Sequence, residues 1–100
     1  MTDQASCCHR KHTPRSDELK HDVEKRINRV IGQLGGIRAM IGEDRYCGDV
    51  LIQLAAVEKA VAAISRMVMQ DHLETCVVEQ VQAGNIEVIA EVMDLLKRFA

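Results

Sequence analysis

The sequence predicts an all-α fold of three helices with a long middle helix. Tyr46 and Phe99 are the only aromatic residues and there is one proline, whereas β-sandwiches and barrels use many aromatic residues and turns. Apolar residues recur at spacings of three and four, the period of one helix face. Glycine-containing breaks near positions 42 and 84 divide this pattern into three stretches. At 100 residues, the chain has room for one small core.

Residues 1–16 are polar and basic without apolar periodicity, and we expect a flexible N-terminal arm. Residues 17–100 form the predicted helical domain. Ser16 is placed to cap the first helix, and the acidic side chains of Asp17 and Glu18 suit its positive end. The apolar stripe of this helix comprises Leu19, Val23, Ile27, Val30, Leu34, Ile37 and Ile41. Three interior glycines, Gly32, Gly35 and Gly36, predict close approach by another helix, because each costs about 1 kcal/mol relative to alanine.

The second pattern begins near Asp49 and continues without a break signal to Gly84. Its stripe comprises Val50, Leu54, Val57, Val61, Ile64, Val68, His72 and Cys76. A helix of roughly 35 residues is about 50 Å long, which exceeds the diameter of a domain of this size. Such a helix cannot bury its apolar stripe within its own chain. We therefore expect an antiparallel dimer with a shared four-helix bundle, and a short third helix from Ile86 to Leu96 packed outside.

Three residues of the middle helix are candidate metal ligands. His72 and Cys76 lie four residues apart on one helix face, within the apolar stripe. Either residue alone is better explained as part of a core, and the pair makes a core and a metal site about equally plausible. Cys47 lies 25 residues before His72, about 38 Å away along a straight helix. In an antiparallel dimer, Cys47 of one subunit lies beside His72 and Cys76 of the other, which favours the metal site.

Two thiolates and one imidazole suit Cu(I), whereas Zn(II) prefers a fourth ligand. The arm contains further potential ligands, Cys7, Cys8, His9 and His12, whose role the sequence leaves open. We find no phosphate-binding glycine loop, no nucleophile motif and no di-iron motif, so an enzyme is not expected. The chain has no long apolar run and no apolar N-terminal stretch, and we expect it in the cytoplasm.

The basic residues concentrate between positions 10 and 38, and the last third of the chain is acidic. This asymmetry is compatible with a surface for polyanions, although from charge alone a solvated helix face is the better explanation.

The sequence from about Lys20 to Phe99 resembles the CsoR/RcnR family of all-helical bacterial metal-sensing repressors, and most closely its copper-sensing type. The resemblance rests on residues 26–37 (RINRVIGQLGGI), 44–57 (DRYCGDVLIQLAAV) and 72–77 (HLETCV). Nickel and cobalt sensors carry histidine in place of the last cysteine, persulfide sensors lack the histidine, and formaldehyde sensors lack the second cysteine. This chain has Cys47, His72 and Cys76.

The resemblance implies a dimer of dimers, a homotetramer that binds operator DNA in the metal-free form. Cu(I) bound between subunits by Cys47, His72 and Cys76 would release the DNA and derepress copper-efflux genes. It also implies that Tyr46 and Glu91 link the metal to the DNA-binding state. Separately, we expect Nδ1–H of a metal-bound His72 to donate a hydrogen bond to an acceptor next to the site and so to shift the outer helix and the basic face. Arg26, Arg29 and Lys59 are the implied DNA contacts.

Two other functions remain open at this point. A thiol-based redox or persulfide sensor would link Cys47 and Cys76 directly across the dimer. A helical scaffold without nucleic acid would show no salt-sensitive DNA binding.

Overall fold

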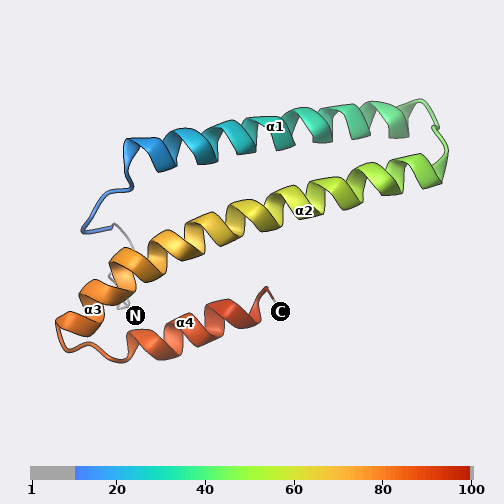
Figure 1. The fold of residues 1–100 in the computed structure, drawn as a ribbon. Helices are drawn as coiled ribbons and strands as arrows, with labels where there is room; N and C mark the ends of the chain where they lie inside the picture. The colour runs from blue at the N-terminus through green and yellow to red at the C-terminus, as the bar shows by residue number, and fades with distance from the viewer. Residues whose placement is uncertain (1–10, 100) are drawn as a thin grey trace. The chain divides into compact units, whose positions relative to one another are not determined.

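The computed structural model describes residues 11–99, which contain helices and no strands (Figure 1). The helices are α1 (Asp17–Gly42), α2 (Cys47–His72), the π-helical turn η1 (Leu73–Val77), α3 (Val78–Gln82) and α4 (Val88–Lys97). Because α2, η1 and α3 follow one another without a loop, the described chain has three helical rods, of which the middle one is the longest. The predicted all-α, three-helix class is confirmed.

The described residues fall into two compact units. Ser16–Val68 form the first, here called the hairpin unit, and residues 11–15 together with 69–99 form the second, here called the C-terminal unit. The predicted boundary of the arm at residue 16 stays a prediction, since residues 1–10 lie outside the described part. No helix among the described residues combines the length and the apolarity that a membrane span requires.

Helix α1 begins and ends with local hydrogen bonds. The Ser16 hydroxyl accepts a hydrogen bond from the Leu19 amide at 3.1 Å, as the capping prediction requires. At the other end, the Arg45 amide donates to the Met40 carbonyl at 2.9 Å. Asp44, with φ of 56°, turns the chain there, because aspartate is one of the few residues other than glycine that tolerate a left-handed conformation.

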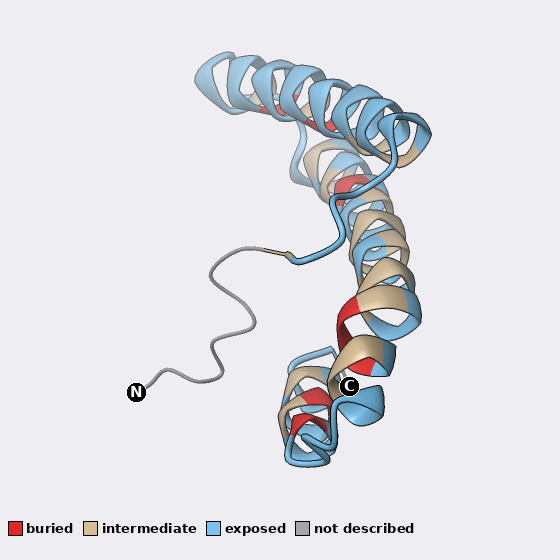
Figure 2. Cartoon of the chain, turned by 90° about the vertical axis from the view of Figure 1, so that its left-hand side faces the viewer, coloured by how far each residue is buried: buried red, intermediate tan, exposed pale blue. Residues whose placement is uncertain are grey.

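The hairpin unit has a small core between α1 and the first part of α2. Val30, Ile37 and Val57 are buried in it, and the partly buried residues packed against them are Val50, Leu54, Ala60 and Ile64. These residues belong to the predicted apolar stripes, apart from Ala60. Most other apolar side chains of the unit remain exposed, including Leu51 at 62% and Ile52 at 67%. In Figure 2, α1 is largely pale blue and α2 is a mixture of pale blue and tan.

The three glycines inside α1 do not meet another helix of this chain. A Cβ atom built at Gly32, Gly35 or Gly36 has no atom of the described chain within 4 Å beyond its own helical surroundings. The prediction of close helix packing at these positions is therefore wrong for the single chain. The face that carries them is open.

The middle rod has the predicted extent but is not uniform. Helical backbone runs from Cys47 to Gln82, and Gly84, with φ of 91°, ends it where the sequence predicted a turn. Leu73–Val77 adopt a π-helical turn that the periodicity did not predict. The Thr75 hydroxyl donates to the Asp71 carbonyl at 2.7 Å, a side-chain bond to the preceding turn that is known to bend helices.

The C-terminal unit has its own apolar cluster of Val77, Val88 and Val92, contributed by η1 and α4. The turn before α4 is held by Asn85, whose amide donates to the Gln80 carbonyl at 2.8 Å and whose side chain donates to Gln80 Oε1 at 2.9 Å. Helix α4 therefore packs back onto the segment that contains His72 and Cys76.

Candidate metal centre

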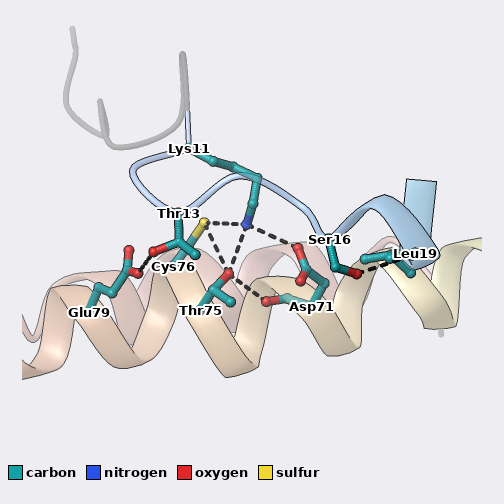
Figure 3. Close-up of polar contacts among 8 residues, drawn as sticks. All are labelled: Lys11, Thr13, Ser16, Leu19, Asp71, Thr75, Cys76 and Glu79. Carbon is teal, nitrogen blue, oxygen red and sulfur yellow. Dashed lines mark hydrogen bonds and ion pairs between the residues drawn. The ribbon is translucent and has the colours of Figure 1, made fainter.

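Cys76 lies within the π-helical turn and is buried, with 7% of its surface exposed. Its Sγ accepts a hydrogen bond from Lys11 Nζ at 3.3 Å, and the Thr75 hydroxyl lies 3.8 Å away (Figure 3). The thiol is not in a disulfide. π-Helical turns are rare and are frequently found at functional sites.

His72 ends α2, one turn before Cys76, and faces helix α4. Its Nε2 atom is buried, has no hydrogen-bond partner among the described residues, and lies 3.7 Å from Glu91 Oε1. The structure thus brings together His72 and Glu91, which the resemblance had linked. Nε2 is the ring nitrogen that faces Glu91 here, and the hydrogen bond expected from Nδ1 of a metal-bound His72 stays a prediction.

Cys47 belongs to the other unit. It is exposed at the start of α2, beside a hollow lined by Ile41, Asp44, Arg45, Val50 and Leu51. Among residues 11–99, no three His, Cys, Asp or Glu side chains converge on a point that could hold a metal ion. One described chain therefore presents two candidate donors in its C-terminal unit and a third in its hairpin unit.

Tyr46, the other residue linked to the site by resemblance, immediately precedes Cys47. The residue is 76% exposed, and its ring lies over the first turn of α2. A Cβ atom at Gly48 would lie 2.5 Å from Tyr46 Cε2, so the ring occupies space that only glycine leaves free at that position.

Lys11 is a neighbour of the site that sequence reasoning missed. Its ammonium group lies 3.0 Å from Asp71 Oδ2 and donates to Thr75 Oγ1 at 2.8 Å, besides its contact with Cys76. Burial by itself would lower the pKa of Lys11, but the hydrogen bonds to Asp71 and Cys76 outweigh it and raise the pKa above the ordinary 10.5. Helical periodicity could not reveal this contact, because it joins segments more than 60 residues apart in the sequence.

The other candidate residues lie at the surface or outside the described chain. Arg26 and Arg29 on α1 and Lys59 on α2 are all exposed and all belong to the hairpin unit. His12 is exposed too. Cys7, Cys8 and His9 lie outside the described residues.

The fold and these donors are those of a helical metal-dependent regulator, and comparison with known proteins identifies the class. Residues 19–98 match the family model of metal-sensitive transcriptional repressors, and the chain belongs to that family. The predicted resemblance is confirmed. Members of the family are DNA-binding repressors rather than enzymes.

Individual relatives agree with this assignment. The copper-sensing transcriptional repressor CsoR of Bacillus subtilis (strain 168) is 34% identical over 92 residues, which cover 91% of each chain. The crystal structure of the copper-sensing repressor CsoR with Cu(I) from Geobacillus thermodenitrificans NG80-2 has a TM-score of 0.81 at 32% identity, covering 87% of this chain and 92% of that one. The nickel-responsive regulator InrS has a TM-score of 0.68 at 34% identity, covering 91% of this chain and all of that one.

Proposed function

We propose that this protein is a Cu(I)-responsive transcriptional repressor that acts in the cytoplasm. Metal-free protein binds operator DNA, and binding of Cu(I) to Cys47 of one subunit and to His72 and Cys76 of another releases it. The observation that carries the proposal is the division of the donors: a buried thiol and an imidazole one turn apart in the C-terminal unit, and an exposed thiol in the hairpin unit.

The donor set fits Cu(I) better than the other metals of the family. Two thiolates and one imidazole are soft ligands in low number, as Cu(I) prefers, whereas Ni(II) prefers four or more donors in a tetragonal arrangement. When bound, Cu(I) supplies a link between thiolates that are otherwise separate. Nδ1 of His72 is the nitrogen available to it, since Nε2 faces Glu91.

The site requires a second copy of the chain. Apolar side chains on α1 and α2 remain exposed, among them Ile31, Leu51 and Ile52, each at 60% or more. A partner helix packed on these faces would bury them and approach the open side of Gly35. This supports an antiparallel dimer as the unit that completes the metal site, and a dimer of dimers as the DNA-binding form.

The approach of His72 to Glu91 connects the site to helix α4. An imidazole that binds metal through Nδ1 is neutral and carries its proton on Nε2, which can donate to a nearby carboxylate. The present separation of 3.7 Å is longer than a hydrogen bond. Closing it would draw α4 and the π-helical turn together. Tyr46 is next to Cys47 in the sequence, and we propose that it acts on the Cys47 donor as Glu91 acts on His72.

Arg26, Arg29 and Lys59 are proposed to bind the phosphate backbone of DNA. They are exposed on the hairpin unit, and long basic side chains on a helical surface suit contact with phosphates. Binding of this kind weakens steeply as salt rises.

The test is anaerobic titration of fluorescent operator DNA, selected from a random-sequence pool with the metal-free protein. We expect Cu(I) at one equivalent per subunit to release the DNA, and Ni(II) to have no such effect. His72→Ala should abolish release by Cu(I). A protein that keeps its DNA at one equivalent of Cu(I) is not a copper-responsive repressor. If DNA is instead released by oxidants or persulfide, and His72→Ala leaves that release intact, the protein is a thiol sensor.

A further inference from the structure

The side chain of Lys11 is packed against the segment that carries Cys76. It is 13% exposed, and its three ammonium protons match three acceptors: Asp71 Oδ2 at 3.0 Å, Thr75 Oγ1 at 2.8 Å and Cys76 Sγ at 3.3 Å (Figure 3). The Thr13 hydroxyl, two residues after Lys11, donates a second hydrogen bond to the Glu79 carboxylate, one helical turn beyond Thr75. Lys11 therefore occupies a defined site on the helical surface.

The ammonium group is held there independently of the sulfur. A charge with so little exposure requires a partner of opposite charge, and Asp71, itself only 16% exposed, supplies it. The Thr75 hydroxyl is fixed in turn by its bond to the Asp71 carbonyl. Two of the three N–H groups of Lys11 donate to oxygen atoms, and the third is directed at Cys76 Sγ.

This arrangement suits the charge that metal binding places on the sulfur. When a thiol binds a metal, its proton passes to the solvent and the sulfur takes on thiolate character. One Cu(I) ion with two thiolates leaves a net charge of −1 at the site. A bound thiolate still has lone pairs that accept N–H hydrogen bonds, and a neighbouring cation stabilises the excess negative charge.

We infer that Lys11 is a positioning residue of the metal centre, whose ammonium group donates to Cys76 Sγ and offsets its negative charge in the Cu(I)-bound protein. The inference rests on the proposed function, because it requires Cys76 to be a ligand. It gives the segment before α1 a role in metal affinity.

The experiment measures Cu(I) affinity of the full-length protein by anaerobic competition with a chromophoric Cu(I) chelator. Lys11→Met, which keeps most of the length of the side chain and removes its charge and donors, should weaken Cu(I) binding about 10- to 100-fold. Lys11→Arg should restore most of the affinity. Lys97→Met is the matched control, since it removes the same charge from an exposed position of the same unit and should leave the affinity unchanged.

A double-mutant cycle separates this role from a merely structural one. In a Cys76→Ala background, Lys11→Met should have no further effect on residual Cu(I) binding, and circular dichroism should show unchanged helix content in every variant. Parental affinity in Lys11→Met overturns the inference and leaves the proposed function standing. Tighter binding also overturns it, because Lys11 would then compete with the metal. Failure of the parent protein to bind Cu(I) overturns both.

Discussion

Replacing Glu91 is expected to separate metal binding from DNA release. The carboxylate lies 3.7 Å from His72 Nε2, and the two side chains are 30% and 18% exposed. A hydrogen bond to a charged acceptor contributes about 1.5–3 kcal/mol, equivalent to roughly 10- to 150-fold in an equilibrium constant. This range covers most of the coupling of about 1–3 kcal/mol that is typical between allosteric sites. Glu91→Ala should therefore remove most of the copper response, and Glu91→Gln, which keeps a neutral acceptor, should remove less.

The assay is fluorescence anisotropy of labelled operator DNA with and without one equivalent of Cu(I), and the measured quantity is the ratio of the two dissociation constants. Cu(I) affinity is measured separately for each variant. Glu87→Gln is the control, because Glu87 is an exposed carboxylate at the start of the same helix. A Glu91→Ala protein that releases DNA as fully as the parent would refute the reasoning. So would one whose Cu(I) affinity falls in parallel with its response, since Glu91 would then act on metal binding alone.

Four further outcomes are expected. Ile37→Val, at a site 5% exposed, should lower the free energy of unfolding by about 0.5–1.5 kcal/mol in chemical denaturation, and an unchanged midpoint would contradict the described core. Gly48→Ala should displace the ring of Tyr46 and lower its fluorescence anisotropy, which is readable because the chain has one tyrosine and no tryptophan. Arg26→Ala should reduce the slope of the logarithm of the DNA-binding constant against the logarithm of the salt concentration by about one. An unchanged slope would show that Arg26 does not contact a phosphate. The pKa of Lys11 is raised on folding, so the contribution of Lys11 to the free energy of unfolding should be complete below pH 10.5 and disappear as pH rises through the folded-state pKa. The measurement is the difference in that free energy between the parent and Lys11→Met as a function of pH. A difference that disappears already near neutrality would contradict the expectation.

The sequence was sufficient to predict the helices, because local signals set their ends. The hydroxyl of Ser16 caps α1, and Gly84 ends the middle rod in a conformation that glycine adopts without strain. The spacing of apolar residues identified Ile37 and Val57 as core positions. These features depend on residues that are close together in the chain.

The site was predictable only in part, because some of its contacts are not local. The spacing of His72 and Cys76 placed both on one helix face, but periodicity does not report the π-helical turn Leu73–Val77 that contains Cys76, nor the bond from the Thr75 hydroxyl to the Asp71 carbonyl. The contact of Lys11 with Cys76 depends on where a segment without helical pattern folds back. The three glycines of α1 marked an open face, but the sequence could not say whether this chain or another covers it.

The division of the donors between two units has a thermodynamic consequence. If the metal site forms only between subunits, Cu(I) binds the assembled form and not the separate chains, so it stabilises assembly in proportion to its affinity. If bound Cu(I) also weakens DNA binding, DNA must weaken Cu(I) binding by the same factor, because the two coupling free energies are one quantity. A repressor built in this way therefore responds at a higher concentration of free Cu(I) when it is bound to its operator than when it is free. Measuring the Cu(I) affinity with and without saturating operator DNA gives the coupling independently of the DNA titration, and the two values must agree because linkage is reciprocal. Replacing Cys47, His72 or Cys76 should abolish both values together if these residues form the switch.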